Sequence, residues 1–168
     1  MQVCGKYVSP IGDIVLCADN HGLTGLWFEG ESAEARHKPA EMQDGDAAKF
    51  IEEAKSWLDI YFDGREPVFT PKLHLIGTNF RLEVWNRLLE IPYGKTISYG
   101  EIARELAHRR GIERMAAQAV GGAVGHNDIS IIVPCHRVIG SDGKLTGYGG
   151  GLDKKVFLLE LEQGKISE

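Results

Sequence analysis

The sequence predicts an α+β protein in which a small sheet-and-helix unit is followed by a mostly helical unit. Three short apolar segments separated by turn residues occupy the first 28 positions, and one amphipathic helical segment follows them. From residue 78 onward, apolar residues recur with helical spacing, and capping residues and glycines separate the segments. We therefore expect an N-terminal α/β domain over residues 1–76 and a C-terminal domain over residues 77–168.

The N-terminal domain is expected to contain three strands and one helix. The strands cover residues 3–8, 14–17 and 23–28, with turns at 9–12 and 20–22. Residues 29–46 are acidic and rich in small side chains, which indicates a solvated loop. A helix over residues 47–62 ends at Asp63-Gly64, and residues 65–77, which include two prolines, connect the domains. One face of that helix collects Phe50, Ala54, Trp57, Leu58 and Tyr61.

The C-terminal domain is expected to begin with a helix that Thr78 caps and that Ile-Pro-Tyr-Gly at 91–94 stops. Ser98 and Glu101 form a capping-box pattern that opens a second helix, and residues 109–111, Arg-Arg-Gly, turn the chain. A third helix covers residues 113–124, so the last two helices have the outline of a helix-turn-helix. The inward faces of the first two helices hold Val84, Trp85, Leu88, Leu89, Ile102, Ala103 and Leu106.

Gly121-Gly122 lies inside the third helix, where each glycine costs roughly 1 kcal/mol relative to alanine. One explanation is the close approach of another backbone, either of this protein or of DNA. The alternative is that the helix frays at this point.

The last part of the chain combines an apolar segment, a cysteine and a glycine-dense run. Residues 129–133, apolar except for Ser130, predict a strand that leads into Pro-Cys-His-Arg at 134–137 and then into the glycines of 140–151. A final helix over residues 154–163 is expected to be capped by Asp153 and ended by Gly164. Its Glu162 projects from a largely apolar face, so we expect the carboxylate to be paired or reactive, unless it is exposed at the helix end.

A cysteine between an apolar strand and a glycine-rich loop suggests a nucleophile presented to a ligand. His136 offers a proton acceptor beside Cys135, and the thiolate is the reactive form of a cysteine. Adjacent side chains of an extended segment point to opposite faces, so these two should not bond directly unless the chain bends. The alternative is a buried cysteine beside a surface histidine.

The charge is unevenly distributed along the chain. The net charge is -5, but residues 1–79 carry 7 Lys+Arg against 13 Asp+Glu, whereas residues 80–168 carry 12 against 11. The second half contains a basic cluster that is compatible with a phosphate backbone, or with a solvated helix face. The cluster consists of Arg104, Arg109, Arg110 and Arg114.

Composition argues for a protein of the cell interior. No apolar run is long enough to cross a bilayer, and the N-terminus does not resemble a signal peptide. Cys4, Cys17 and Cys135 have no spacing typical of a disulfide framework, which favours a reducing compartment. We therefore expect a cytoplasmic location and no membrane partner.

Several segments together carry a family resemblance. They are Ile-Pro-Tyr-Gly-Lys-Thr-Ile-Ser-Tyr-Gly-Glu-Ile-Ala at 91–103, Ala-Val-Gly-Gly-Ala at 119–123, Asn127, Ile-Ile-Val-Pro-Cys-His-Arg-Val at 131–138 and Gly-Tyr-Gly-Gly-Gly-Leu at 147–152. They closely resemble the O6-alkylguanine-DNA alkyltransferases, also called methylated-DNA–protein-cysteine methyltransferases. The match is dense from about residue 80 to residue 162 and thinner before it. It implies a ribonuclease-H-like N-terminal domain and a winged helix-turn-helix C-terminal domain.

The resemblance implies DNA repair by a single-turnover reaction. An alkyl group passes from O6 of an alkylated guanine, or O4 of an alkylated thymine, to Cys135, and the protein is not regenerated. A soft, polarizable thiolate suits attack at an alkyl carbon. By the same resemblance, His136 acts through a water molecule and Glu162 orients it. Tyr99 matches the phenol that donates to the guanine oxygen, and Asn127 matches the asparagine that braces the active-site turn.

The implied partner is double-stranded DNA that contains alkylated guanine, with the damaged base flipped out of the duplex. The helix over residues 113–124 then enters the minor groove. Gln118 stands where many relatives carry an arginine that fills the gap left by the base, and Gly149 stands where some relatives have serine. DNA contacts are expected from Gln118, Ala119, Gly121, Gly122, Arg137 and Tyr99, and a substrate pocket from Val138, Tyr148, Gly149 and Lys155.

The resemblance implies no cofactor, and the protein is expected to be a monomer. Some relatives bind zinc, and Cys4, Cys17, His21 and His74 could form a Cys/His site, but only Cys4 and His74 fall near the family's ligand positions, so we expect no metal. One alternative function is a recognition protein that binds alkylated DNA without transfer, which the presence of Cys135 disfavours. Another is a cysteine hydrolase, for which no oxyanion-hole motif is present.

Overall fold

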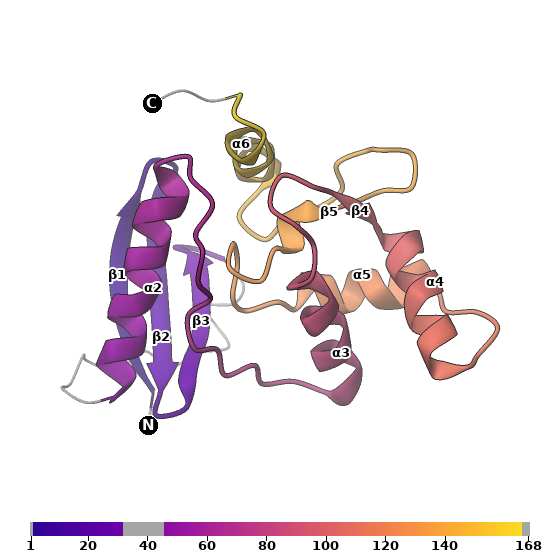
Figure 1. Cartoon of the computed structure of the whole chain (residues 1–168), viewed down its shortest axis with the longest axis horizontal. Helices are drawn as coiled ribbons and strands as arrows, with labels where there is room; N and C mark the ends of the chain where they lie inside the picture. Colours follow the sequence, from indigo (N-terminus) through magenta and orange to yellow (C-terminus); the bar gives the residue numbers. More distant parts are fainter. Residues whose placement is uncertain (1, 32–45, 166–168) are drawn as a thin grey trace.

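The computed structural model describes residues 2–31 and 46–165, and it has the predicted mixed α and β fold. An antiparallel sheet of strand order β1-β2-β3 forms from β1 (Val3–Ser9), β2 (Gly12–Asp19) and β3 (Gly22–Phe28). The helix α2 (Asp46–Phe62) packs against this sheet (Figure 1). The predicted strands and helix are confirmed, and most of the loop predicted over residues 29–46 lies outside the described residues.

The second part of the chain is mostly helical (Figure 1). It contains α3 (Asn79–Leu88), β4 (Ile97–Ser98), α4 (Tyr99–Arg110), α5 (Ala117–Gly125), the short 3-10 helix η1 (Cys135–Arg137), β5 (Val138–Ile139) and α6 (Leu152–Glu162). The strands β4 and β5 pair in parallel. The domain boundary expected after residue 76 falls in the connection between α2 and α3.

The starts of two helices match the prediction, and the starts of two others differ from it. The hydroxyls of Thr78 and Ser98 accept from the backbone N–H of the third residue that follows, as predicted. The predicted cap at Asp153 was wrong, since α6 begins after Gly151 and no side chain caps it. The helix predicted from residue 113 begins only at Ala117, without a side-chain cap, and Met115 ahead of it packs against the core.

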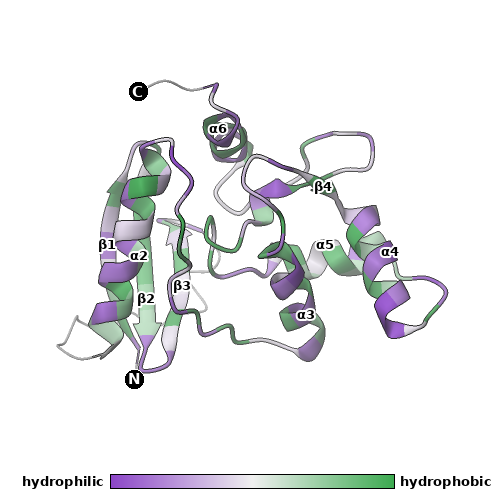
Figure 2. Ribbon diagram, in the orientation of Figure 1, coloured by the Kyte–Doolittle hydropathy of each residue, from purple (hydrophilic) through white to green (hydrophobic). Residues whose placement is uncertain are grey.

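The core is continuous between the two parts of the chain. Ala54, Leu58 and Tyr61 of α2 are fully buried over the sheet. In Figure 2 the strand β2 is drawn largely in green, whereas α2 carries alternating green and purple bands, as a helix packed on one side should. In the second part of the chain, Trp85 of α3 donates its indole N–H to the carbonyl of Ala123 on α5 at 2.8 Å. No described helix is long and apolar enough to span a membrane.

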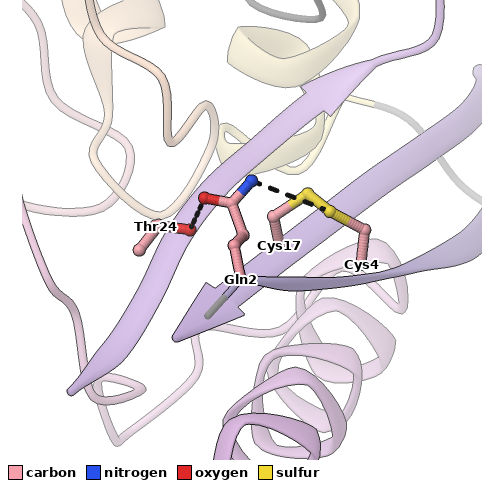
Figure 3. Close-up of a disulfide and its surroundings, with 4 residues drawn as sticks. All are labelled: Gln2, Cys4, Cys17 and Thr24. Atoms are coloured by element: carbon pink, nitrogen blue, oxygen red, sulfur yellow. Dashed lines mark hydrogen bonds between the residues drawn. A yellow bond between two sulfur atoms is a disulfide. The ribbon is translucent and has the colours of Figure 1, made fainter. Parts of the chain in front are cut away.

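Cys4 on β1 and Cys17 on β2 form a disulfide (Figure 3). They are direct cross-strand partners, with Cα atoms 4.1 Å apart. The lack of a framework spacing therefore did not exclude a disulfide, because the register of the sheet, which sequence spacing does not reveal, brings Cys4 and Cys17 together. The disulfide removes the argument for a reducing compartment. It also takes both sulfurs that the alternative zinc site would need, whereas Cys135 is free.

The edge of β3 holds the segment that leads to Cys135. Leu26 N–H donates to the carbonyl of Asp128, and Ser130 N–H donates to the carbonyl of Leu26, both at 2.8 Å. These bonds form an isolated parallel bridge between Leu26 and Ile129. The N-terminal sheet thus fixes the backbone just ahead of the predicted nucleophile.

Candidate active site

A cavity of about 550 Å³ opens beside Cys135, which is 8% exposed. The volume lies within the range of small-ligand pockets, about 300–1,000 Å³. Its walls come from the loop after β3, the start of α4, the helix α5 and the loop before α6. Besides Cys135 the lining consists of Glu31, Tyr99, Ala117, Gln118, Gly121, Val124, Gly125, Asn127, Ser130, Thr146, Gly147, Tyr148 and Gly149.

Tight turns present Cys135, so the strand predicted over residues 129–133 was wrong. Ile131 has a φ of 70°, a strained value for a branched side chain, and Ile132 N–H bonds across it to the carbonyl of Ser130 at 2.8 Å. Residues 129–138 are all buried. The apolar pattern indicated that the segment is buried, and this was correct. The burial comes from packing between the two parts of the chain, not from a strand.

Asn127 braces these turns, as the resemblance implied. Its Nδ2 donates to the carbonyls of Ile129 and Val133 at 3.1 and 3.0 Å, and its Oδ1 accepts from Ile129 N–H at 3.0 Å. One buried amide therefore satisfies three backbone groups of an irregular segment. That network offsets part of the strain stored at Ile131.

Glu162 lies behind the nucleophile and accepts four hydrogen bonds. His136 Nε2 and the Tyr61 hydroxyl bond to Oε2 at 2.5 and 2.6 Å. Arg137 Nε and Gly94 N–H bond to Oε1 at 2.7 and 3.1 Å. The carboxylate that the sequence placed on an apolar face is thus buried and fully paired.

The buried pair of His136 and Glu162 has defined protonation states. Burial opposes the charged carboxylate, but the hydrogen bonds from His136 and Arg137 and the positive charge of Arg137 outweigh it and hold the pKa of Glu162 below its ordinary value. Burial lowers the pKa of His136 against the pull of Glu162, and Arg137 and Lys155 add to the lowering. A neutral His136 donates through Nε2–H, which leaves a lone pair on Nδ1. That Nδ1 is buried and has no hydrogen-bond partner among the described residues.

Cys135 rests as a thiol in this structure. Burial raises the pKa of the thiol to about 11, with Glu31 adding to the rise, whereas Asn127 and Lys155 act in the opposite direction. Attack by sulfur therefore requires a proton acceptor. His136 Nδ1 is suited to this role, although no hydrogen bond joins the two side chains directly among the described residues.

Tyr99 and α5 form the open side of the cavity. The Tyr99 hydroxyl accepts from the Thr146 hydroxyl at 3.3 Å, so the phenol can still donate its own proton into the cavity. Gln118 lines the cavity and is exposed. Gly121 faces the Tyr99 ring, and a Cβ added at Gly122 would meet nothing within 4 Å. A side chain at position 121 would therefore touch the Tyr99 ring at van der Waals distance, whereas position 122 is open.

The predicted basic cluster is partly neutralised by one carboxylate of α3 and one of the turn that follows it. Arg109 lies 3.7 Å from Glu90, and Arg110 lies 3.1 Å from Glu83. These pairs leave fewer free cations for a phosphate backbone than the sequence suggested.

Three predicted site residues lie behind the cavity lining. Arg137 is 8% exposed and donates to Glu162 and to the carbonyl of Ile91, so its guanidinium is engaged within the protein, and its contact with DNA stays a prediction. Lys155 is buried and donates to the carbonyls of Val138 and Thr146 at 2.8 and 3.0 Å. Neither Val138 nor Lys155 lines the cavity; they fix the strand and the loop around it.

Sequence reasoning missed two residues of the N-terminal part. Tyr61 was assigned to the apolar face of α2, although a buried phenol usually needs a hydrogen-bond partner, which was the available signal. Glu31 lines the cavity from the loop after β3, and no local pattern distinguishes it from its acidic neighbours.

Two family models match almost the entire chain. The model described as "6-O-methylguanine DNA methyltransferase, ribonuclease-like domain" matches residues 2–75. The model described as "6-O-methylguanine DNA methyltransferase, DNA binding domain" matches residues 79–164.

Curated relatives and solved structures agree with these models. A methylated-DNA–protein-cysteine methyltransferase of Methanosarcina acetivorans is 46% identical, over 93% of this chain and 95% of the relative. A protein of the same name from Mycobacterium leprae is 45% identical, over 97% of this chain and 93% of the relative. The crystal structure of Mycobacterium tuberculosis OGT in complex with DNA matches with a TM-score of 0.80 and 43% identity, covering 98% of this chain and 93% of that one.

Proposed function

The chain belongs to the family of methylated-DNA–protein-cysteine methyltransferases, which repair DNA by alkyl transfer, and we propose that its own acceptor is Cys135. In this proposal the donor is O6-alkylguanine in double-stranded DNA, and each molecule reacts once. O4-alkylthymine is a second proposed donor. The observation that carries the proposal is the free thiol at the wall of the cavity, with a neutral His136 held by Glu162 behind it.

The reaction is an attack of the Cys135 sulfur on the alkyl carbon. The new S–C bond forms as the C–O6 bond breaks, and the electron pair of that bond leaves with the guanine. The thiol proton passes to His136 Nδ1, with a water molecule as the carrier. Tyr99 donates a proton to the guanine, and the proton held by His136 then restores the phenol. The products are a neutral S-alkylcysteine and an unmodified guanine.

Raising the pKa of Cys135 fits a protein that must react only with its substrate. A thiolate exposed to solvent would meet other electrophiles, whereas a buried thiol requires its proton acceptor at the moment of attack. Because a thioether cannot be displaced under mild conditions by the groups in this cavity, the protein ends alkylated.

DNA contact is proposed for the exposed side of α5. Gln118 stands at the cavity and is long enough to enter the space left by a flipped base, and Ala119 and Gly122 offer a surface without bulk. The solved complex of the Mycobacterium tuberculosis protein with DNA supports DNA binding by this chain. All groups of the proposed site belong to one chain, so we expect a monomer to act.

A titration of the lesion tests the proposal. A duplex with one O6-methylguanine is mixed with increasing protein, and the remaining O6-methylguanine is measured after digestion of the DNA. The loss should be linear and stop at one lesion per protein molecule, and Cys135→Ser should remove none. Tight lesion binding without loss would instead establish a recognition protein, and continued turnover would indicate a hydrolase.

A further inference from the structure

Glu31 places a carboxylate in the cavity from the N-terminal part of the chain. It follows β3, where its backbone N–H bonds to the carbonyl of Phe28 at 3.1 Å. Its own Oε1 accepts from Phe28 N–H at 2.9 Å. These two bonds hold the Glu31 side chain at the end of the sheet. They therefore also fix the position of its other oxygen, Oε2.

The second oxygen of Glu31 fills the space beside Gly149. A Cβ added at Gly149 would lie 2.5 Å from Glu31 Oε2 and 3.4 Å from its Cδ. The carboxylate therefore occupies volume that any larger residue at position 149 would need. Gly149 adjoins Tyr148, and both line the cavity together with Cys135.

This position matters for the group that is transferred. The reacting alkyl carbon must touch Cys135 Sγ, so any further atoms of the group extend into the same cavity. Glu31 is close enough to the thiol for its charge to raise the pKa of Cys135. A bulky apolar group would have to displace the carboxylate or pack against its charge, and both are costly.

We propose that Glu31 is a specificity-determining residue that restricts the transferred group to small alkyl groups. The inference rests on the proposed function, since it concerns the same cavity. It assigns to the N-terminal part a direct role in substrate selection, through a side chain that closes the cavity beside Gly149.

Rates with two donors of different size test the inference. Second-order rate constants are measured for duplexes that carry either O6-methylguanine or O6-benzylguanine, with wild type, Glu31→Ala, Glu31→Gln and the control Glu29→Ala. Glu29 is an exposed acid of the same turn whose partner, Lys6, lies outside the cavity. The ratio of benzyl to methyl rate should rise at least about tenfold in Glu31→Ala, less in the isosteric Glu31→Gln, and not in Glu29→Ala. If the ratio of benzyl to methyl rate is unchanged in Glu31→Ala, the inference about Glu31 is overturned. The proposed function is still supported in that case, provided that the wild type transfers the methyl group.

A binding measurement separates the two proposals if wild type transfers no group. In the Cys135→Ala background, the dissociation constants of the O6-methylguanine and O6-benzylguanine duplexes are measured with and without Glu31→Ala. A selective gain for the benzyl duplex supports the role of Glu31 whatever the fate of the transfer reaction. An equal effect on both duplexes overturns it.

Discussion

The hydroxyl of Tyr61, on α2, donates to Oε2 of Glu162, on α6, at 2.6 Å. The two residues are 101 positions apart, and the same carboxylate oxygen bonds to His136. The N-terminal part of the chain therefore takes part in orienting the proposed proton acceptor. Because Tyr61 is buried, its pKa is raised well above the ordinary value, by burial first and by Glu162 second, and the phenol stays a donor.

Tyr61→Phe should remove this donor without changing the shape of the core. We expect a loss of about 1–2 kcal/mol in the free energy of unfolding, since a buried carboxylate loses one of four donors. The rate of methyl transfer should fall, and its dependence on pH should shift because His136 is held less firmly. Urea denaturation and a pH–rate profile measure both effects. The control is Tyr7→Phe, which removes a phenol that bonds to Asp59 away from the cavity; a pH profile equally altered in both variants would contradict the role of Tyr61.

Asn127→Ala should destabilise the turns that present Cys135. The change leaves the N–H of Ile129 without its partner in a buried segment. The carbonyls of Ile129 and Val133 each lose one of two donors and keep their bonds from Val133 N–H and Cys135 N–H. We expect a loss of about 1–3 kcal/mol in the free energy of unfolding, which is the cost of one unpaired buried backbone group. Urea denaturation of this variant and of Asn86→Ala, an exposed asparagine of α3, gives the comparison. A loss below about 1 kcal/mol would show that the turns do not depend on the amide.

Acid should destabilise the fold through Glu162 and His136. Both groups have pKa values below the ordinary ones in the folded protein, so the folded state binds fewer protons than the unfolded state. The contribution of His136 is present above about pH 6.5 and is lost as the pH falls through its lowered pKa. That of Glu162 is present above about pH 4.5 and is lost as the pH falls through its lowered pKa.

Carbon-13 NMR of the side-chain carboxyl of Glu162 measures this titration directly, alongside urea denaturation between pH 8 and pH 3. The expected result is a carboxyl that stays ionised at pH 3 and a stability that declines below about pH 6.5. A Glu162 that titrates near its ordinary pKa would contradict the buried network of four donors.

Gln118→Ala should impair repair of duplex DNA more than reaction with a free base. The side chain lies at the cavity on an exposed helix face, where it can hold open a flipped base, and a free base needs no flipping. We expect the rate on an O6-methylguanine duplex to fall about tenfold, against less than about twofold with free O6-benzylguanine. The control Gln163→Ala removes an exposed glutamine that does not line the cavity. Equal losses on both substrates would mean that Gln118 does not act on the duplex.

Local patterns predicted the fold well where a segment's own residues decide its structure. The three strands, α2 and the caps at Thr78 and Ser98 follow from alternation, helical spacing and hydroxyl side chains. The segment over residues 129–133 was different. Its apolar residues are buried between the two parts of the chain. Its backbone bonds to Asn127 and Leu26, and no local sequence pattern predicts these hydrogen-bond partners. The pairing of Cys4 with Cys17 likewise depends on the register between two strands, which the residues of one strand do not reveal.

The site could be predicted only as far as the motif extends. Cys135, Tyr99, Asn127, Tyr148 and Gly149 do line one cavity. Arg137 and Lys155 were assigned to DNA and to the substrate pocket by the family resemblance. In the structure they donate hydrogen bonds to backbone carbonyls, and Arg137 also to Glu162. Glu31 and Tyr61 reach the site from the other part of the chain, and only the packing of the two parts reveals them.

The central claim is that Cys135 itself receives the alkyl group. The most direct test is intact-mass and peptide-map analysis after the protein is mixed with a duplex carrying one O6-methylguanine. The account predicts a gain of one methyl group on the peptide that contains Cys135, with saturation at one per protein molecule. An unmodified Cys135 in a protein that binds the lesion tightly, or a methyl group found on another residue, would contradict it.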